Sequence, residues 1–435
     1  MTVVLPKKVT ELDEDLTPSL DDLLFVTNDP DGAPVSKKVS IGNLIKTMGW
    51  VDVRKHGAVG DGVTDDTAAI QAAIDSGANG TIIGFPGNNS TYAIGTGGTG
   101  LVLPTDKRIW LRGAGWRGCT LKALANCTMI SLPSSAGQNF IEISGFVLNG
   151  NNNVGTIIDI NGNSFTNTHD VRFANMTTGV DLTDTGANFT KIWNNTFSTL
   201  TNGILFDNAC NATRILNNDF FGAMAYGIKS NATFVGDDIL IQGNTFGCSS
   251  PTNNILLQTT SGFQGIMAKI INNRFDNANS NSDVNIGRYM SGIVENNSFA
   301  SASPSHIICD GYEVTIGKNY HATSTGPAIS LTSNSNRCVV YKSRFGTGGE
   351  VCSSKYSDVG TANIFDLNSG YGISSAIATG ATIAHGLGVA PDIIHITAAE
   401  SGPTDIYASA DATNITVNFG GGGNKIFYWF AGVKP

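Results

Sequence analysis

Acidic side chains recur along the middle of the chain in a pattern that could support acid–base chemistry. The set consists of Asp207, Asp237, Asp238, Asp310 and Glu313. Two carboxyl groups about 5 Å apart suit retaining glycoside hydrolysis, and groups about 6.5 to 9.5 Å apart suit the inverting reaction. One member of such a pair acts as the general acid and needs a raised pKa. These five residues are therefore the candidate catalytic groups.

Side chains that bind sugars occur close to these acids. Lys229, Gln258, Arg288, Tyr289 and Tyr312 are the candidate substrate-binding residues. An arginine beside a tyrosine also suits β-elimination of a uronic acid, in which the cation neutralises the carboxylate and the tyrosine transfers a proton. Residue types alone leave hydrolysis and elimination open. A solvated surface has the same polar composition, so that interpretation stays open as well.

A repeat of roughly 25 residues must position these groups. In each repeat a short apolar run precedes an asparagine-rich bend, and an aromatic residue follows the bend. The repeats include Asn194-Asn195-Thr196-Phe197, Asn217-Asn218-Asp219-Phe220, Gly243-Asn244-Thr245-Phe246, Asn272-Asn273-Arg274-Phe275 and Asn296-Asn297-Ser298-Phe299. Asparagine tolerates the left-handed backbone conformation, so it suits a sharp bend between strands. Helices are disfavoured because the segments are short, β-branched and rich in glycine and asparagine.

The repeat predicts an all-β fold, a right-handed parallel β-helix with coils of about 25 residues. Successive coils stack at the strand spacing of about 4.8 Å. Acids one or two coils apart would therefore lie near the distances that glycoside hydrolysis requires. The outward position at the end of one strand in each coil is polar, and it includes Asp207, Gln258 and Asp310.

Composition narrows the possible partners. The chain has 435 residues, a net charge of −9 and only 14% charged residues. The negative charge argues against nucleic acid, which requires a basic surface. The sequence shows no segment for membrane insertion and no signal peptide, so we expect synthesis in a host cytoplasm. It also shows no spacing typical of a metal site, and it implies no cofactor.

Residues 51–75 carry the most specific motif. They predict a strand, a glycine-rich turn and a helix capped by Thr64, Asp65 or Asp66, with Ile70 on its apolar face. Such a helix would cover the open end of a β-helix, which otherwise presents unpaired strand edges. The three aspartates of the motif are expected to serve turns and caps rather than a metal ion.

This motif closely resembles the opening of the pectate-lyase-like superfamily found in bacteriophage tailspikes and polysaccharide depolymerases. Lys55-His56 stands where the family has an aspartate and an aromatic residue, which is a minor departure. The resemblance covers roughly residues 50–350 and marks the fold rather than an active site. It implies a homotrimeric phage tailspike, located in the virion tail and acting outside the cell. The sequence motifs that mark polygalacturonases are absent.

Four regions are expected. Residues 1–48 form an N-terminal segment for attachment to the phage tail or baseplate, and 49–350 form the β-helix. Residues 351–372 form a linker, and 373–435 form a C-terminal β-sandwich for trimerisation, because they read as alternating strands with a glycine-rich hairpin.

The expected function is binding, and depolymerisation by glycoside hydrolysis, of a bacterial surface polysaccharide such as a capsule, O-antigen or exopolysaccharide. A non-catalytic fibre or adhesin of the same fold is one alternative. A polysaccharide lyase acting by β-elimination, or a free secreted lyase or epimerase, is another. The active site could also lie between chains of the trimer.

Overall fold

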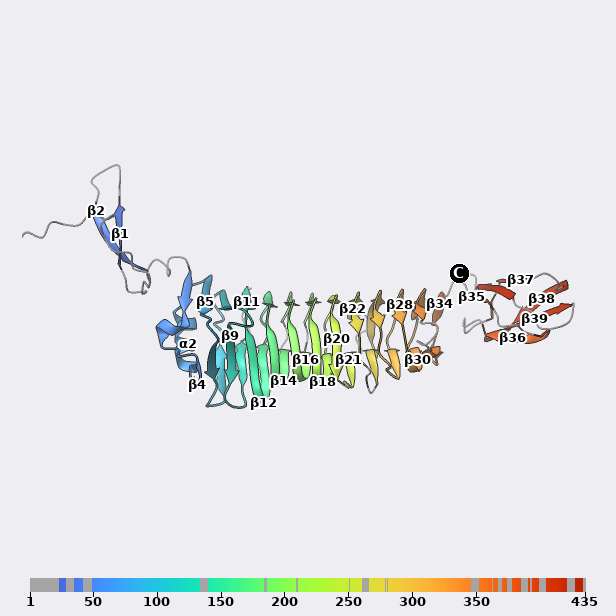
Figure 1. Ribbon diagram of the computed structural model, residues 1–435, viewed down its shortest axis with the longest axis horizontal. Coiled ribbons are helices and arrows are strands. Elements are labelled where there is room, and N and C mark those ends of the chain that lie inside the picture. The colour runs from blue at the N-terminus through green and yellow to red at the C-terminus, as the bar shows by residue number, and fades with distance from the viewer. Residues whose placement is uncertain are drawn as a thin grey trace, which may run out of the picture.

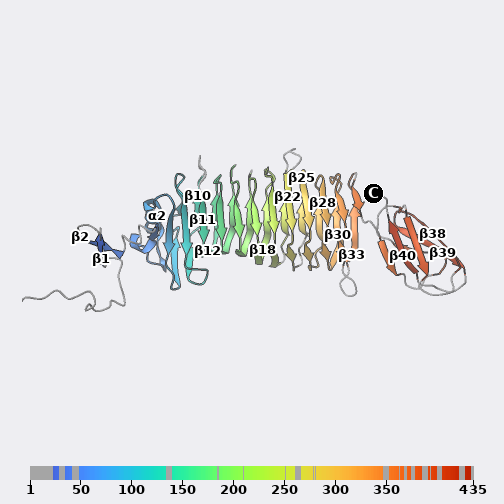
Figure 2. The same ribbon diagram turned by 90° about the horizontal axis from the view of Figure 1, so that it is seen from above.

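A computed structural model shows a long solenoid with small antiparallel sheets beyond its two ends (Figures 1 and 2). The structure describes residues 23–28, 35–41, 49–133, 140–183, 186–208, 210–249, 251–259, 266–277, 279, 281–345, 352–361, 363–366, 370–373, 378–384, 390–391, 393–398, 404–420 and 427–432. The all-β fold with a parallel β-helix expected from the sequence is confirmed.

Each coil of the solenoid contributes one strand to a first face, a parallel sheet of 13 strands. These strands are β3 (Trp50–Asp52), β5 (Thr81–Phe85), β8 (Ile109–Gly113), β11 (Ile141–Ser144), β13 (Thr166–His169), β15 (Lys191–Trp193), β17 (Arg214–Leu216), β19 (Ile239–Gln242), β22 (Ile266–Ile271), β25 (Met290–Glu295), β28 (Val314–Gly317), β31 (Val339–Tyr341) and β34 (Ile364–Asp366). Their inward side chains are mainly isoleucine, leucine and valine, which favour a pleated, buried surface.

The second face begins just after the asparagine bend. Its strands are β4 (Asp61–Asp65), β6 (Ser90–Ile94), β9 (Cys119–Ala123), β20 (Thr245–Ser249), β23 (Arg274–Phe275), β26 (Ser298–Phe299), β29 (Tyr320–His321) and β32 (Arg344–Phe345).

The third face completes each coil before the chain returns to the first face. Its strands are β7 (Thr99–Val102), β10 (Thr128–Leu132), β21 (Asn253–Leu257), β24 (Ser282–Ile286), β27 (Ser305–Cys309), β30 (Ser324–Leu331) and β33 (Cys352–Asp358). Four long strands run across both the second and third faces, namely β12 (Val147–Ile160), β14 (Arg172–Leu182), β16 (Thr196–Phe206) and β18 (Asp219–Ser230).

The asparagine pairs make the corner between the first and second faces. The first residue of a pair takes the left-handed conformation, as in Asn194 (φ 56°) and Asn272 (φ 57°). The second is buried and bonds to the next coil. The side-chain amide of Asn218, for example, donates to Oδ1 of Asn244 at 3.0 Å, and Asn244 donates to Asn273 at 3.0 Å. The ladder therefore satisfies buried polar groups and fixes the register of neighbouring coils.

The aromatic residue of each repeat lies in the core directly behind this corner. Phe173 and Phe197 are stacked with ring centroids 4.5 Å apart, and the column continues through Phe220, Phe246, Phe275 and Phe299. A histidine, His321, takes the next place in the column, 5.0 Å from Phe299. Burying each phenylalanine contributes roughly 1.5–3 kcal/mol, so the repeat is chiefly a stability element.

Helix α2 (Thr67–Ser76) covers the first coil, as expected, and buries Ile70, Ala73 and Ile74. It follows the short 3-10 helix η2 (Val53–His56) and strand β4. The carboxylate of Asp66 accepts hydrogen bonds from the backbone N–H groups of Val59 (2.6 Å) and Gly60 (3.1 Å), so this buried acid holds the glycine-rich turn.

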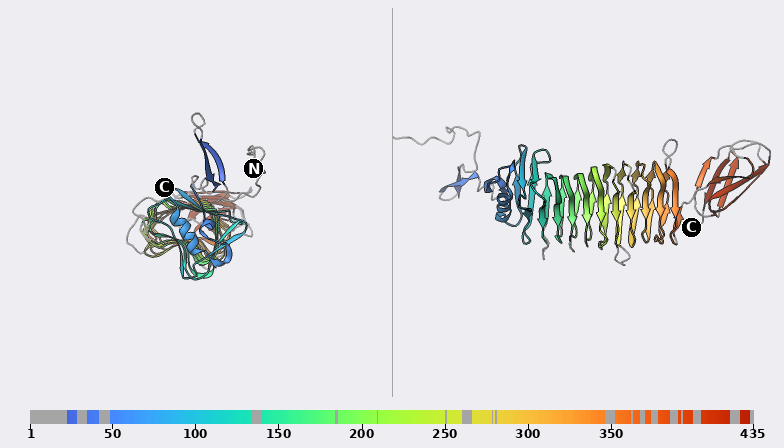
Figure 3. Two further views of the ribbon diagram at one scale, coloured as in Figure 1. Left: turned by 90° about the vertical axis from the view of Figure 1, so that its left-hand side faces the viewer. Right: turned by 90° about the horizontal axis from the view of Figure 1, so that it is seen from below.

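The acids next to Asp66 serve the same segment. Asp61 accepts from the backbone of Val63 and Thr64, and Asp65 accepts from the backbone of Thr67 at the start of the helix. All three aspartates therefore accept hydrogen bonds from the backbone of the turn or of the helix start. Figure 3 shows the helix lying across the end of the solenoid.

Two three-stranded antiparallel sheets follow the solenoid. One contains β35 (Gly370–Ile373), β40 (Phe427–Gly432) and β37 (Ile393–Ala398), and the other contains β36 (Ala381–Ala384), β39 (Asn414–Gly420) and β38 (Thr404–Ala410). Ile415, Val417, Phe419 and Phe427 form the apolar layer between them. This arrangement is the small C-terminal sandwich that the alternating sequence predicts.

The segment expected as a linker, 351–372, contains strands. Strand β33 pairs in parallel with β30, and β34 pairs with β31, so both belong to the solenoid. Tyr356 of β33 packs against the solenoid core, which explains why the coil continues there. Of the N-terminal 48 residues, the structure describes an antiparallel hairpin of β1 (Leu23–Asn28) and β2 (Val35–Ser40); much of the expected attachment segment lies outside the described residues.

Candidate functional site

The third face carries a column of outward side chains in register from coil to coil. Asp159 of β12 pairs with Asp181 of β14, and the column continues through Leu205, Lys229 and Leu256. Asp207 follows the end of β16, two positions beyond Leu205. Because neighbouring strands lie about 4.8 Å apart, the register brings three carboxylates together near the start of this face.

Asp181 is the most perturbed member of this carboxylate cluster, which consists of Asp159, Asp181 and Asp207. Burial, together with the nearby charges of Asp207 and Asp159, raises the pKa of Asp181 to about 7. Its Oδ1 atom is buried without a hydrogen-bond partner. A carboxyl group in this setting holds its proton near neutral pH and can donate it, as a general acid must.

The other two acids of the cluster are anchored. Thr183 donates a hydrogen bond to Oδ1 of Asp159 at 2.6 Å, although burial still raises the pKa of Asp159. The side-chain amide of Asn231, one coil further on, donates to Oδ1 of Asp207. These contacts fix both carboxylates beside Asp181. The cluster therefore combines an acid whose pKa is raised to about 7 with acids that are held in place.

Sequence reasoning selected Asp207 but missed Asp159 and Asp181. The polar column expected from the sequence consists of the outward residues at the strand ends, whereas Asp159 and Asp181 occupy the outward position two residues earlier. Strand β12 also contains register shifts between Asn149 and Thr156, so the spacing between its aspartate and the next coil departs from the repeat. Acids two residues before the strand ends, at the preceding outward position, are the signal that would have identified Asp181.

A hollow of about 610 Å³ lies further along the same face. Four residues selected from the sequence line it together, namely Gln258, Arg288, Tyr289 and Asp310. The guanidinium of Arg288 lies over the ring of Tyr289, 4.9 Å from its centroid. The volume lies within the range of small-molecule sites, which are typically about 300–1,000 Å³. We call this hollow the third-face pocket.

Asp310 is engaged by neighbouring side chains. The amide of Asn334 donates to its two oxygens at 3.0 and 3.1 Å, and the hydroxyl of Thr332 donates to Oδ1. No other acidic residue is among those that line the pocket, within the described part of the chain. The third-face pocket therefore offers binding groups but no carboxyl pair of its own.

Lys229 and Tyr312 lie outside the third-face pocket. The ammonium group of Lys229 lies over the ring of Tyr226, 4.8 Å from its centroid, in the column between the carboxylate cluster and the pocket. The Tyr312 hydroxyl and Glu313 both contact Arg337, at 2.7 and 3.2 Å.

Glu313, Asp237 and Asp238 lie near the corner that leads to the first face. Glu313 and Asp238 take the left-handed conformation there, with φ 54° and 51°. Asp238 forms an ion pair with Arg214 at 2.5 Å, and Asp237 accepts from the backbone N–H of Met267 at 3.1 Å. The structure thus separates these three acids from the carboxylate cluster by element and gives each a local partner.

The described residues contain no group of three or more potential metal ligands among histidine, cysteine, aspartate and glutamate. No helix within the same ranges has the length and apolarity needed to cross a membrane.

Comparisons with known proteins give structural likeness only. No family model matches the sequence, and no curated protein matches it. A protein of Geobacillus virus E2, ORF18, has a TM-score of 0.54 at 16% identity, covering 91% of this chain and 82% of that one. The two proteins share the parallel β-helix fold.

Two other solved structures are similar at lower scores. The tailspike protein of E. coli bacteriophage HK620, solved with a pentasaccharide, has a TM-score of 0.48 at 10% identity and covers 95% of this chain and 97% of that one. The mannuronan C-5 epimerase A-module of Azotobacter vinelandii has a TM-score of 0.46 at 17% identity, covering 73% and 97%. At these identities the likeness concerns the fold alone.

Proposed function

We propose that the chain is a phage tailspike that binds a bacterial surface polysaccharide and cleaves it by glycoside hydrolysis. The observation that carries the proposal is the carboxylate cluster, in which Asp181 keeps a proton near neutral pH beside Asp159 and Asp207. The solenoid shared with a viral protein supports the phage assignment, as does the tailspike-like opening motif. The proposal includes tail attachment through residues 1–48 and trimerisation through the C-terminal sandwich.

In the proposed reaction Asp181 donates its proton to the glycosidic oxygen. Asp207 acts from the other side of the bond, as nucleophile or as the base that activates water. The third-face pocket binds further units of the same glycan through Gln258, Arg288 and Asp310. A long sugar chain can contact both sites because they share one face and one column of coils.

Cleavage of surface polysaccharides from a panel of candidate hosts tests the proposal. The wild-type protein should release reducing ends, whereas Asp181→Asn should lower kcat about 10²- to 10⁴-fold because the general acid is lost. Asp219→Asn is the matched control, since Asp219 is exposed on the second face. Full activity of the Asp181 variant would exclude Asp181 as the acid. Binding without products across the panel would exclude hydrolysis and favour an adhesin.

One observation favours a second candidate function. Arg288 and Tyr289 lie together in the third-face pocket, which is the pair that β-elimination of a uronic acid would use. A lyase would leave unsaturated products that absorb ultraviolet light. Recording that absorbance beside the reducing-end assay separates the two reactions. If the protein is a lyase, Arg288→Gln should abolish the reaction; if it is a hydrolase, the variant should only bind the polysaccharide more weakly.

A further inference from the structure

A second hollow, of about 370 Å³, lies at the corner between the first and second faces. Arg172, at the start of β14, and the corner residue Asn194 contribute to it, with Phe221 of β18. Trp116 reaches it from the loop between β8 and β9. The volume is suited to about one sugar unit, given the range of small-molecule sites. We call it the corner pocket, and it lies on different faces from the carboxylate cluster.

Arg172 brings an unpaired positive charge to the corner pocket. Its guanidinium forms no hydrogen bond or ion pair with any other described residue, and its Nε atom is buried without a partner. A buried polar group without a partner is costly, so a ligand that brings an acceptor to this guanidinium would be stabilised. The planar guanidinium fork matches a carboxylate or phosphate with two parallel hydrogen bonds.

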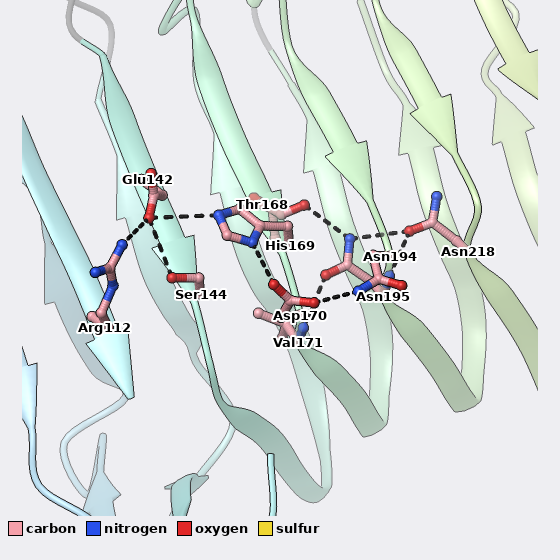
Figure 4. Close-up of polar contacts among 10 residues, drawn as sticks. All are labelled: Arg112, Glu142, Ser144, Thr168, His169, Asp170, Val171, Asn194, Asn195 and Asn218. Atoms are coloured by element: carbon pink, nitrogen blue, oxygen red, sulfur yellow. Dashed lines mark hydrogen bonds and ion pairs between the residues drawn. The ribbon is translucent and has the colours of Figure 1, made fainter. Parts of the chain in front are cut away.

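The nearby carboxylates are already engaged with other residues (Figure 4). Glu142 pairs with Arg112 at 2.9 Å and contacts Nε2 of His169 at 3.5 Å. Asp170 contacts Nδ1 of His169 at 2.8 Å with one oxygen and accepts from the amide of Asn194 with the other. His169 thus lies between two acids and fixes both. These contacts orient Asp170 along the pocket wall and leave Arg172 as the cation available to a ligand.

Two exposed aromatic side chains form the apolar part of the pocket. Trp116 is 51% exposed and Phe221 is 40% exposed. Solvent-facing aromatic rings in a hollow suit the apolar faces of a sugar ring, because the ring buries hydrocarbon while its hydroxyls stay with polar groups. Arg117 lies over the Trp116 ring, 4.8 Å from its centroid, and covers one side of the indole.

We propose that the corner pocket is a glycan subsite for a sugar that carries a carboxylate, such as a hexuronic acid unit. The carboxylate pairs with Arg172, the sugar ring packs on Trp116 and Phe221, and Asn194 lies beside its hydroxyls. Asp170 on the pocket wall repels a doubly charged phosphate more strongly than a singly charged carboxylate, so the phosphate fits less well. This inference rests on the proposed function in one respect, namely that the ligand belongs to a surface polysaccharide.

Direct binding of small uronates tests the subsite. Glucuronate, galacturonate and mannuronate, each beside its uncharged methyl ester, are titrated at millimolar concentration and followed by ligand-observed NMR. At least one uronate should bind, and its ester should bind at least tenfold more weakly. Arg172→Gln should remove this preference for the acid. Trp116→Ala should weaken the binding of the uronate and of its ester by a similar factor. Because Trp116 is in an exposed loop, this variant should fold normally and keeps the test decisive if the Arg172 variant folds poorly.

Arg274→Gln is the matched control. Arg274 occupies the same outward column four coils further on, but it pairs with Asp276 at 2.7 Å and lines no part of the corner pocket. It should leave uronate binding unchanged. Inorganic phosphate is included as a competitor: displacement of the uronate by phosphate at equal concentration would overturn the assignment to a carboxylate.

Binding of acid and ester with equal affinity, an Arg172 variant that keeps the preference, or no binding of any uronate would each overturn the subsite. These results are independent of the cleavage assay. If Asp181→Asn remains fully active while Arg172→Gln loses uronate binding, the hydrolase assignment fails and the subsite stands. If the reverse is found, the subsite fails and the hydrolase stands.

Discussion

Burial and the neighbouring carboxylate of Asp207 hold the pKa of Asp181 at about 7, with a smaller contribution from Asp159. Asp181 and Asp207 lie on successive coils, so the stacking of the solenoid creates this relationship. A like charge close by disfavours ionisation of a buried carboxyl group, and the proposed reaction uses this effect by giving Asp181 the role of acid. A β-solenoid can therefore build an acid pair by placing one acid on each of two neighbouring coils.

Removing the charge of Asp159 should move the pH dependence of cleavage. In Asp159→Asn the repulsion that helps to keep Asp181 protonated is weaker, so the pKa of Asp181 should fall. The alkaline limb of the profile of kcat/KM against pH should then move to lower pH, because the proposed reaction uses Asp181 in its protonated form. The measurement is the initial rate of reducing-end release over a pH series, with Asp219→Asn as control. An alkaline limb that stays in place or moves upward would contradict the role given to this cluster.

The asparagine ladder should contribute strongly to stability. In Asn244→Ala the amide that donates to Asn273 and to the carbonyl of Ile215 is lost, and the donors of Asn218 lose their acceptor. Each buried group left unsatisfied costs about 1–3 kcal/mol, so the free energy of unfolding should fall by several kcal/mol. Urea denaturation measures this loss.

Asn272→Gly serves as the control for the ladder. Asn272 has a left-handed backbone (φ 57°) and an exposed side chain, and glycine adopts this conformation without steric cost. Its stability should change by less than about 1 kcal/mol. A similar loss in both variants would mean that the bend, rather than the buried amide, carries the stability.

The fold followed from the sequence because corner and core requirements recur in every coil. Asn244 and Phe246 repeat the places that Asn218 and Phe220 hold in the preceding coil, so the spacing of such residues reveals the period directly. The carboxylate cluster was harder to find because it depends on coils that do not repeat perfectly. The register shifts within β12 change the spacing before Asp159, and no chemical requirement makes an acid recur in the column.

The partner of a charged side chain depends on contacts between coils, which the sequence alone does not show. Asp238 and Asp310 look alike in sequence, yet Asp238 pairs with Arg214 at a corner while Asp310 faces the third-face pocket. Arg172 and Arg274 occupy equivalent outward positions, but Arg274 pairs with Asp276, whereas Asp170, two residues before Arg172, is engaged by His169 and Asn194. Whether a charged residue pairs with a residue of another coil can be seen only in the structure.

Acidic conditions should destabilise the solenoid through its buried histidine pair. His306 and His321 contact each other through their Nδ1 atoms at 2.9 Å, and burial lowers the pKa of both. A histidine with a lowered folded-state pKa contributes stability above its unfolded pKa of about 6.5 and loses it as pH falls below that value. The melting temperature should therefore fall as pH decreases from about 7 to about 5.

His321→Phe tests this assignment because phenylalanine continues the aromatic column on both sides. The variant removes one of the two groups that must stay neutral, so its melting temperature should depend less on pH over the acidic range. The measurement is differential scanning calorimetry at matched ionic strength. An unchanged slope in the variant would show that other groups cause the acid sensitivity.

Raising the pH toward neutrality should weaken the contribution of Asp283 to the stability of the same region. This side chain is fully buried, and burial raises its pKa to about 7 even though Ser301, Asn254 and Asn279 donate hydrogen bonds to it. A raised folded-state pKa contributes stability that is complete below the unfolded pKa of about 3.9 and is lost as pH rises through about 7. Between about pH 4 and about pH 7 the wild-type protein should lose unfolding free energy through this group, and Asp283→Asn should lose less, because the amide never ionises. Urea titrations of both proteins across this range measure the difference. Parallel losses in the two proteins would show that Asp283 does not titrate there.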